Sequence, residues 1–564
     1  MVKLNGSQMI LEALHEEGVD VVFGYPGGAA LNIFDEIYKQ TYFKTILVRH
    51  EQAAVHAADG YARATGKVGV SLVTSGPGFT NAITGLATAY ADSIPMVLIS
   101  AQVANSLIGT DAFQEIDAIG ISRPCVKHNF LVKSVADLPR VLKEAFYIAR
   151  SGRPGPVHVD IPKDVTAIIG EFNYPNEIKI ETYKPTYKGN SRQIKKICEL
   201  LTTAKKPLLY LGGGVILSDA SEIVREFVKI TQIPAVETLM ALGVLRDDDP
   251  CNLKMVGMHG SYVANMAMSE ADLIIALGAR FDDRVTGKLS EFAKFAKIVH
   301  VDIDPSSISK IVDADYPVVG DIKCVLEELL PRVKKDVDPS NFAQWRDTLK
   351  KYDELHPLCF KDNDEILKPQ WVIRETAKIL ADDDAIIATD VGQHQMWVAQ
   401  FYPFNKPRTF LTSGGLGTMG YGLPAAMGAK FGIQNRPVVC FGGDGSVLMN
   451  IQELQTCIDE GASVIYIILN NSFLGMVRQW QGLFYEKRYS MTDLSGAKKP
   501  NFTKICEAFG GAGYEVKTKD EFRDALKSAI NANKVAFIDV QIDRFEEVLP
   551  MVPAGGALYN MILE

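Results

Sequence analysis

The chain has 564 residues, of which 47% are hydrophobic and 23% are charged, and its formal net charge is −9. These values are typical of soluble globular proteins with two to four domains. The acidic balance, without long runs of one sign, argues against a nucleic-acid or anionic-membrane partner. No stretch approaches the roughly 18 apolar residues of a membrane span, and the N-terminal residues predict a helix rather than a signal peptide. The eight scattered cysteines lack a C-x-x-C spacing and indicate a reducing compartment, so we expect a cytoplasmic protein.

Short apolar runs alternate with amphipathic stretches along almost the whole chain. Examples are "VGVSLVTSGPG", "DLIIALGARF" and "PVVCFGGDG". Many of these runs end in Gly, Pro, Asp or Asn, as do strands that are buried on both faces and joined by crossover helices. The pattern predicts an α/β protein with doubly wound parallel sheets, in which ligands bind outside the carboxyl ends of the strands.

Two breaks in this pattern divide the chain. Residues 171–191 are rich in Pro, Tyr and Lys, and residues 333–357 are polar and charged. We interpret both as linkers, the second one partly helical. They predict three α/β domains, at residues 1–170, 190–335 and 365–550.

In the first predicted domain, "ILVRHEQAAVHAADGYARATG" (46–66) predicts a short strand followed by a helix that begins at Glu51. The helix is rich in alanine, and small residues allow a flat ring to approach closely. By itself, a Glu in the first turn of a helix is explained by the helix dipole.

The second predicted domain contains "LYLGGG" and "VHVDIDPSSISK". It has no G-x-G-x-x-G, so the pattern alone gives weak support for a dinucleotide site. Gly213 would let a phosphate approach the backbone, and Asp302 and Asp304 could accept hydrogen bonds from ribose hydroxyls. The alternative is a structural domain without a ligand.

In the third predicted domain, "PVVCFGGDGS" predicts a strand, a glycine turn and the start of a helix, and "SVIYIILNN" is the next strand. Asp444 and Asn471 follow these two strands and are separated by about one crossover unit, so they can lie side by side. Carboxylate, amide and phosphate oxygens form a hard site that suits Mg²⁺. Taken separately, each residue could be an ordinary turn or capping residue.

The G-D-G run followed by two asparagines resembles the thiamine diphosphate-binding motif of thiamine-dependent enzymes. The resemblance implies Mg²⁺ between Asp444, Asn471 and the diphosphate, with the backbone carbonyl of Phe473 as a further ligand. Thiamine chemistry also needs a carboxyl group that exchanges a proton with the aminopyrimidine, and Glu51 matches that position. Enzymes of this arrangement place the glutamate and the diphosphate site on different subunits, which implies a homodimer or homotetramer.

Other stretches in all three predicted domains resemble the catalytic (large) subunits of acetohydroxyacid synthase, also called acetolactate synthase. "GARFDDRVTGK" (278–288) and "GMVRQWQ" (475–481) are the most specific of them. The resemblance implies a transferase that decarboxylates pyruvate and ligates the hydroxyethyl carbanion to pyruvate or 2-ketobutyrate. The products would be 2-acetolactate or 2-aceto-2-hydroxybutyrate, for branched-chain amino acid biosynthesis. Few residues follow the last predicted strand, so we expect feedback regulation to need a separate small subunit.

The resemblance also implies site residues. Those near thiamine diphosphate would be Gln393, His394, Gly417, Met419, Gly443, Gly445, Ser446, Leu474, Gly475 and Met476. Those at the reacting centre, besides Glu51, would be Gly28, Gln114, Lys163 and Trp480, the last favouring 2-ketobutyrate.

The stretch "RFDDRVTG" resembles the FAD-binding branch of these enzymes, although the net reaction has no redox step. Besides Gly213, Asp302 and Asp304, the implied FAD residues are Arg153, Thr238, Leu239, His259, Gly278, Arg280, Asp282, Arg284 and Asp321. Three alternatives stay open: a pyruvate oxidase with FAD, a catabolic acetolactate synthase without FAD, and a non-catalytic protein on the same fold.

Overall fold

The computed structural model describes residues 2–381 and 384–564. Within these residues, three six-stranded sheets and one two-stranded sheet are present. The chain divides into two compact units. Unit 1 comprises residues 1–183, 379–394 and 411–544, and unit 2 comprises residues 184–378, 395–410 and 545–564.

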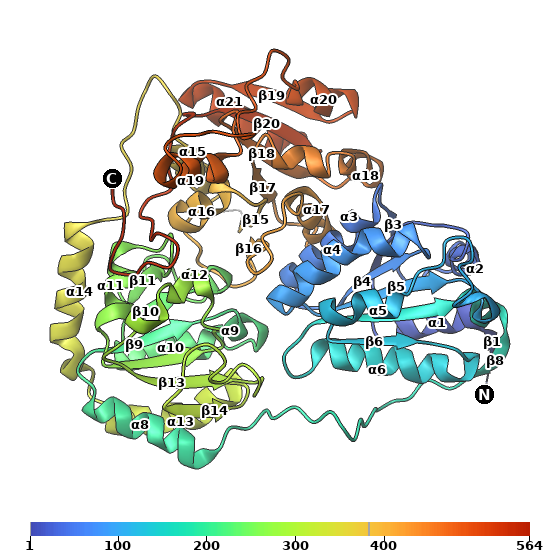
Figure 1. Cartoon of the computed structure of the whole chain (residues 1–564), viewed down its shortest axis with the longest axis horizontal. Coiled ribbons are helices and arrows are strands. Elements are labelled where there is room, and N and C mark those ends of the chain that lie inside the picture. Colours follow the sequence, from blue (N-terminus) through green and yellow to red (C-terminus); the bar gives the residue numbers. More distant parts are fainter. Residues whose placement is uncertain (1, 382–383) are drawn as a thin grey trace. The chain divides into compact units, whose positions relative to one another are not determined.

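The first sheet of unit 1 has the strand order β3-β2-β4-β5-β7-β6, and its neighbouring strands pair in parallel (Figure 1). The strands are β2 (Val21–Gly24), β3 (Lys44–Leu47), β4 (Gly69–Val73), β5 (Met96–Gln102), β6 (His128–Leu131) and β7 (Pro156–Pro162). The flanking helices include α1 (Gly6–Glu16), α3 (Glu51–Thr65), α4 (Pro77–Asp92) and α6 (Leu138–Arg150). Alternate residues of β5 enter two separate cores, Val97 and Ile99 with α1 and α6, and Met96 and Leu98 with α3 and α4. Helices therefore cover both faces of this sheet.

The second sheet of unit 1 has the order β16-β15-β17-β18-β20-β19. Its strands are β15 (Ile386–Thr389), β16 (Phe410–Leu411), β17 (Val438–Gly442), β18 (Val464–Asn470), β19 (Ala512–Val516) and β20 (Ala536–Gln541). Its helices include α17 (Gly422–Gly432), α18 (Glu453–Glu460), α19 (Gly475–Phe484), α20 (Phe502–Ala508) and α21 (Lys519–Ala532). The five-residue strand β17 is fully buried, as the unbroken apolar run predicts.

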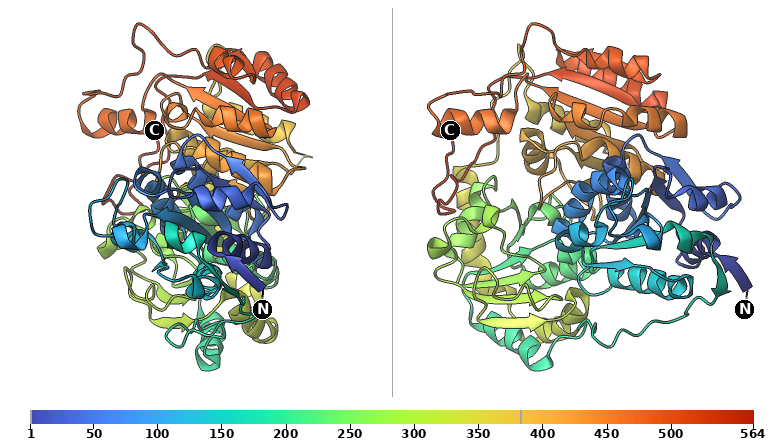
Figure 2. Two further views of the ribbon diagram at one scale, coloured as in Figure 1. Left: turned by 90° about the vertical axis from the view of Figure 1, so that its right-hand side faces the viewer. Right: turned by 45° about the vertical axis from the view of Figure 1, so that its right-hand side comes forward.

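The two sheets of unit 1 meet where α3 packs against α17, and both helices contribute to one core (Figures 1 and 2). A Cβ atom at Gly60 would lie 2.1 Å from the Ala425 carbonyl oxygen, and one at Gly428 would lie 1.8 Å from the Ala57 carbonyl oxygen. Only glycine allows this backbone approach. The small residues of α3 therefore serve helix packing in addition to any role toward a ligand.

Unit 2 contains one parallel sheet of order β11-β10-β9-β12-β13-β14. The strands are β9 (Pro207–Leu211), β10 (Ala235–Glu237), β11 (Asn252–Met255), β12 (Leu273–Leu277), β13 (Lys297–Asp302) and β14 (Tyr316–Val319). The main helices are α8 (Ser191–Thr203), α10 (Ser221–Thr231), α11 (Tyr262–Glu270), α13 (Ile322–Asp336) and α14 (Ala343–Leu355). Along the chain, β10 and β11 are added on one side of β9, and β12, β13 and β14 are then added on its other side. The switch point between β9 and β12 is where doubly wound sheets bind ligands.

The predicted α/β class with doubly wound parallel sheets is confirmed. Residues 333–357, predicted as a partly helical linker, do contain a helix, α14, and this helix packs into unit 2. Trp345 is buried, and its Nε1 donates to the Pro207 carbonyl oxygen at 3.2 Å. In the ranges that the structure describes, no helix is long and apolar enough to cross a membrane. The three domain boundaries stay a prediction.

Candidate functional site

Polar residues follow three neighbouring strands of the second sheet of unit 1. Gln393 and His394 come after β15, Asp444 after β17, and Asn471 after β18. Because β17 pairs in parallel with both β15 and β18, these residues lie at one edge of the sheet. A Cβ atom at Gly475 would lie 2.1 Å from Gln393 Oε1 and 2.8 Å from Asn471 Nδ2, so the structure brings these side chains into contact.

Asp444 is buried, with 7% of its surface exposed, and its Oδ1 atom has no hydrogen-bond partner within the described residues. Burial raises the pKa of this carboxyl to about 7, and Asp539 adds to the rise. Lys499 lowers it. A buried carboxylate oxygen without a partner costs free energy unless a cation or donor satisfies it. The position therefore fits a cation.

The segment after β18 presents further oxygen atoms. Asn471 Nδ2 donates to Gln393 Oε1 at 3.3 Å, and Asn471 Oδ1 accepts from the Phe473 backbone N–H at 3.0 Å. The Leu494 N–H donates to the Ser472 carbonyl oxygen, and the Leu474 N–H to that of Thr492, both at 2.9 Å. No group of three or more His, Cys, Asp or Glu that could hold a metal occurs in residues 2–381 and 384–564. A cation here would thus depend on one carboxylate, amide and carbonyl oxygens, and a ligand's own oxygens, the donor set that Mg²⁺ accepts.

Glycines leave space around His394. Burial lowers the pKa of this imidazole to about 3, and its Nε2 has no partner in the described part of the chain. A Cβ atom at Gly443 would lie 3.3 Å from His394 Nδ1, and one at Gly445 would lie 2.7 Å from Leu474 Cδ2. Ser446 Oγ accepts from the Gly443 N–H at 3.1 Å. The imidazole is therefore neutral, and the glycine turn beside it would let a ligand approach the backbone N–H groups.

The loop with Gly417 and Met419 is exposed at Gly417 and half-buried at Met419. Helix α4 of the first sheet holds this loop in place, because Thr88 Oγ1 and Thr418 Oγ1 lie within hydrogen-bond distance, 2.7 Å apart. Asp92 of α4 accepts from the Gly414 and Gly415 N–H groups at 3.0 and 2.7 Å. The loop is therefore held rigidly, as a support for a cofactor requires.

Two residues that sequence reasoning missed also shape this edge. Asp390 directly follows β15, and its carboxylate accepts from the N–H groups of Val391, Gly420 and Gly422 at 2.8, 2.8 and 3.0 Å. Buried Gln479 accepts from Gln393 Nε2 at 2.8 Å. The rule of polar residues at strand ends could have found Asp390, and Gln479 lies within the "GMVRQWQ" stretch, although the sequence does not indicate its contact with Gln393. Met476 lies half-buried in the first turn of α19.

Glu51 is the first residue of α3 and is 9% exposed. Its Oε2 accepts from Asn81 Nδ2 of α4 at 3.0 Å, and a Cβ atom at Gly78 would lie 3.3 Å from its Oε1. His50 caps the helix through Nδ1, which accepts from the Gln52 N–H at 3.1 Å. The carboxyl group is thus placed among small residues at a defined position, and Asn81 is a contact that the sequence did not reveal.

The residues predicted at the reacting centre lie in exposed or half-buried places. Gly28 is exposed, with open space where a side chain would be, and Lys163 is the exposed first residue of α7 (Lys163–Ala167). Gln114 has a φ of +60°, and a Cβ atom at Gly76 would lie 2.8 Å from its carbonyl oxygen. Trp480 packs edge-on against Phe484 of its own helix, with ring centroids 5.5 Å apart. The structure places Gln114 beside the "TSGPG" turn, and within the described residues no contact joins all four side chains or backbone positions.

In unit 2, five predicted FAD residues end or follow strands of the sheet at its carboxyl edge. They are Gly213, Thr238, Gly278, Asp302 and Asp321. At the switch point, a Cβ atom at Gly278 would lie 2.6 Å from Gly214 Cα, and the Gly214 N–H donates to the Gly278 carbonyl oxygen at 3.1 Å. Thr238 Oγ1 and His259 Nδ1 are buried without partners among the residues described. Burial lowers the pKa of His259 to about 4. This edge therefore combines closely approaching backbone with buried polar atoms that have no partner in the described ranges.

Three predicted FAD acids of unit 2 accept hydrogen bonds from their own turns or helix starts. Asp321 caps α13 by accepting from the Cys324 N–H at 3.2 Å, and Asp304 accepts from the N–H and hydroxyl of Ser306 at 2.9 and 2.7 Å. Asp282 caps a short helix and lies 3.6 Å from Arg280. Leu239 is half-buried and Arg284 is exposed. Arg153 belongs to unit 1, where its Nε donates to Ser93 Oγ at 2.8 Å.

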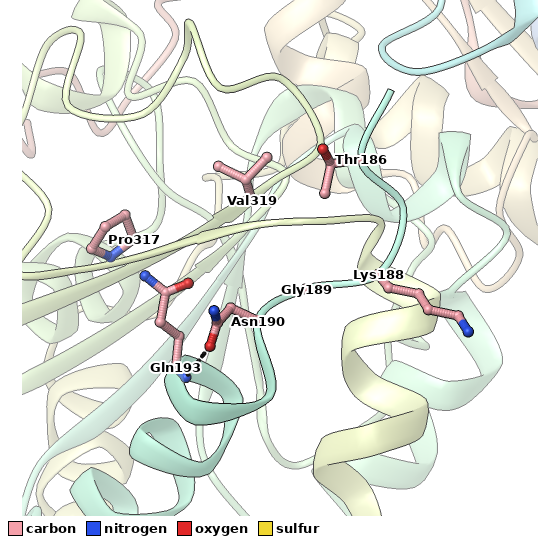
Figure 3. A pocket seen from close by; sticks show the side chains of 7 residues that line it. All are labelled: Thr186, Lys188, Gly189, Asn190, Gln193, Pro317 and Val319. Atoms are coloured by element: carbon pink, nitrogen blue, oxygen red, sulfur yellow. Dashed lines mark hydrogen bonds between the residues drawn. The ribbon is translucent and has the colours of Figure 1, made fainter. Parts of the chain in front are cut away.

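A cavity of about 400 Å³ lies beside the edge strand β14 (Figure 3). Pro317 and Val319 line it from the strand, and Asn190 and Gln193 line it from the start of α8. The Asn190 side chain caps α8 by accepting from the Gln193 N–H at 3.4 Å, so this helix start is already satisfied. None of the predicted site residues lines this cavity.

Comparison with protein families divides the chain into three matched regions. Residues 4–121 match the thiamine pyrophosphate enzyme N-terminal TPP binding domain. Residues 194–329 match the central domain, and residues 390–540 match the C-terminal TPP binding domain of the same enzymes. The edge with Asp444 and Asn471 lies in the last of these regions.

The chain also resembles other proteins over their full length. The chain is 49% identical to the acetolactate synthase large subunit of Haemophilus influenzae, over 100% of this chain and 99% of that protein. It is 48% identical to the acetolactate synthase isozyme 3 large subunit of Escherichia coli, again over 100% and 99%. It is 44% identical to the probable acetolactate synthase large subunit of Methanococcus aeolicus, over 99% and 95%.

Proposed function

Because the chain belongs to the acetolactate synthase large-subunit family of thiamine pyrophosphate enzymes, we propose that it is an acetohydroxyacid synthase. It decarboxylates pyruvate and joins the remaining two-carbon unit to pyruvate or 2-ketobutyrate. The products are 2-acetolactate and 2-aceto-2-hydroxybutyrate, which lead to branched-chain amino acids. Full-length identity of 48–49% to proteins of that name supports the proposal.

The observation that carries the proposal is the buried, unpartnered Asp444 Oδ1 at the strand edge that also holds Asn471. We propose that Asp444, Asn471 and the Phe473 carbonyl oxygen hold Mg²⁺, and that Gln393, His394 and the glycine turn hold the diphosphate of thiamine diphosphate. When bound, this cofactor supplies the electron sink for decarboxylation. The further contacts proposed for it are Gly417, Met419, Gly443, Gly445, Ser446, Leu474, Gly475 and Met476.

Glu51 is proposed to exchange a proton with the cofactor's aminopyrimidine through the carboxyl oxygen that Asn81 does not occupy. We propose that the partner site belongs to a second copy of the chain, in a homodimer or homotetramer. Leu416, Leu448, Met449 and Val477 support this, since these apolar side chains are 44–53% exposed on the segments around the Asp444 edge. Exposed apolar side chains next to a binding edge are typical of surfaces that a partner covers.

Four residues are proposed to act toward the 2-ketoacids. Gly28 and Gln114 would line the reacting centre, and Lys163 would attract a substrate carboxylate. Trp480 would shape the acceptor pocket, because its ring is held against Phe484 and is only half-buried.

FAD is proposed to bind at the carboxyl edge of the unit 2 sheet, with Thr238, His259, Gly213 and Gly278 as its first contacts. The unsatisfied Thr238 Oγ1 and His259 Nδ1 support this site. Residues 1–170, 190–335 and 365–550 are proposed as the functional domains. The name "large subunit" of the relatives supports a separate small regulatory subunit, and we propose a cytoplasmic location without nucleic-acid or membrane partners.

A product assay tests the proposed function. The protein is incubated with Mg²⁺, thiamine diphosphate and FAD, and receives pyruvate with or without 2-ketobutyrate. We expect 2-acetolactate from pyruvate alone, and 2-aceto-2-hydroxybutyrate as the main product of the mixture. The change Trp480→Leu should shift the mixture toward 2-acetolactate, and Phe484→Leu, which removes the ring that packs against Trp480, should cause a smaller shift in the same direction.

Other outcomes would favour the alternatives. Acetate with peroxide or reduced flavin would indicate a pyruvate oxidase, and full activity of a colourless protein would indicate a synthase without FAD. If Glu51→Gln left every turnover unchanged, a non-catalytic role would follow. The family match does not favour any of these three.

A further inference from the structure

The carboxylate of Glu453 lies against the turn that leads into Glu51. Glu453 is the first residue of α18, and the Arg49 backbone N–H lies 3.0 and 3.3 Å from its two oxygens. The backbone N–H of His50 is also near enough to lower the pKa of this carboxyl group. Thr456 Oγ1 lies 2.7 Å from Glu453 Oε2 and 3.4 Å from the Leu47 carbonyl oxygen. One side chain from a helix of the second sheet therefore holds the backbone of Arg49, two residues before Glu51.

Glu453 is entirely buried, with 0% of its surface exposed. Burial raises the pKa of its carboxyl to about 7, and the hydrogen bonds from Thr456 and Arg49 lower it. The titratable groups that face it are Arg49, His50 and Cys457, and Asp459 pairs with the Arg49 guanidinium. A buried acceptor of this kind is expensive to leave unsatisfied, so the hydrogen bonds keep the turn in one position.

Another acid of the same helix provides a comparison. Glu460 also reaches the first sheet, through a 2.8 Å ion pair with Lys44 Nζ, but this pair is partly exposed and lies at the other end of β3. Exposed ion pairs contribute little and fix no geometry. Glu453 instead accepts from a backbone donor, the Arg49 N–H, in the turn between β3 and Glu51. Both acids reach the first sheet, but only Glu453 contacts the backbone that leads into Glu51.

We propose that Glu453 is a positioning residue for Glu51. It fixes the turn at Arg49 and His50, so that the Glu51 carboxyl group keeps its hydrogen bond with Asn81. The proposal rests on the role proposed above for Glu51. Glu453 would thereby connect the sheet that carries Asp444 to Glu51 of the first sheet. The hydrogen bond that makes this connection joins Arg49 and Glu453, which are 404 residues apart in sequence. Glu453 itself contacts no reacting atom, and it acts through the backbone of the turn.

The first test measures the turn directly and needs no turnover. Amide hydrogen exchange of the full-length protein, with and without Mg²⁺ and thiamine diphosphate, is followed in peptides covering residues 47–52. In Glu453→Gln, which keeps the shape but loses the charge and one acceptor oxygen, we expect about tenfold faster exchange at Arg49 and His50. Glu460→Gln is the matched control and should leave these amides unchanged. Equal exchange in both variants would overturn the proposal.

The second test is a double-mutant cycle on the product-forming rate. We expect Glu453→Gln to lower kcat by about 10- to 100-fold while KM for pyruvate and for thiamine diphosphate stays unchanged, because a displaced acid affects chemistry more than binding. In a Glu51→Gln background, Glu453→Gln should cause no further loss, since both changes remove the same function. Multiplying losses, or a rise in KM for thiamine diphosphate equal to the fall in kcat, would contradict a role through Glu51.

A milder variant keeps the proposal testable if Glu453→Gln does not fold. Thr456→Val removes one donor to Glu453 and should give a smaller change of the same kind in both tests. Should the wild-type protein form no acetohydroxyacid while Glu453→Gln still loosens residues 47–52, the proposed function fails and the positioning of the turn stands. Should the wild type be active and Glu453→Gln be as fast, the positioning proposal fails alone.

Discussion

Polar groups gather at the carboxyl edges of two parallel sheets, one in unit 1 and one in unit 2. The two edges differ in whether these groups have hydrogen-bond partners. At the unit 1 edge, Asp444 Oδ1 and His394 Nε2 are buried and have no partner within the described residues. At the unit 2 edge, Asp304 and Asp321 accept hydrogen bonds from their own turns. An acid at a strand end is therefore evidence of a site only when the fold leaves it unsatisfied.

The largest effect is expected from Asp444→Asn. The change removes the only carboxylate of the proposed Mg²⁺ site, so product formation should fall by about 100-fold or more. Measuring kcat over a Mg²⁺ titration checks this. Asp304→Asn, at the other edge, is the control and should leave the Mg²⁺ dependence unchanged.

Asp444→Asn should also change how the stability of the metal-free protein depends on pH. The folded pKa of about 7 lies above the ordinary value of 3.8, so the folded state binds more protons than the unfolded state between these values. Wild-type stability should therefore fall as pH rises from about 4 to 7, and the variant should lose this contribution. Melting temperatures in EDTA across this range test the sign, and parallel curves would contradict it.

A backbone contact is tested by Gly278→Ala in unit 2. The residue has a φ of +62°, and the new Cβ would lie 2.6 Å from Gly214 Cα, so we expect a loss of about 1–3 kcal/mol in the free energy of unfolding. Urea unfolding measures it. Gly461→Ala, at a φ of +68° with nothing within 4 Å, isolates the cost of the backbone angle. Equal losses in both variants would argue against the close contact at the switch point.

The unsatisfied hydroxyl of unit 2 is tested by Thr238→Val. If Oγ1 binds the flavin, its loss should weaken FAD binding by up to about tenfold, the value of one hydrogen bond, with little change in folding. Flavin fluorescence during titration measures the affinity. Thr202→Val, on the surface of α8, is the control, and unchanged affinity in both would remove Thr238 from the site.

The smallest effect is expected at Asp321, which separates capping from ligand binding. Asp321→Ala should cost about 1 kcal/mol of stability with or without FAD, whereas Asp321→Asn should keep the cap and cost little. Unfolding curves with and without FAD distinguish the two. A loss of FAD affinity above tenfold in Asp321→Asn would show that this carboxylate also serves the ligand.

Much of this could be predicted from local patterns. The apolar runs that end in polar residues predicted the doubly wound sheets, and β17 and β18 end where "GGDG" and "NN" predicted. The sheets and the strand ends both depend on residues that are neighbours along one strand, and these can be read from the sequence. The position of Asp444 and Asn471 at one edge then follows from parallel pairing alone.

Tertiary structure decided what each of these residues contacts. Glu453 and Arg49 lie 404 positions apart, and nothing in either segment indicates their hydrogen bond. The glycines of α3 and α17 serve a helix contact that neither helix shows alone, and Asn81 reaches Glu51 from another helix. An acid can lack a hydrogen-bond partner in the described ranges, as Asp444 Oδ1 does, or it can cap a helix, as Asp321 does. Which of these occurs depends on the donors that the fold brings near and on how much water it excludes. Those are properties of packing between distant segments, and local sequence does not encode them.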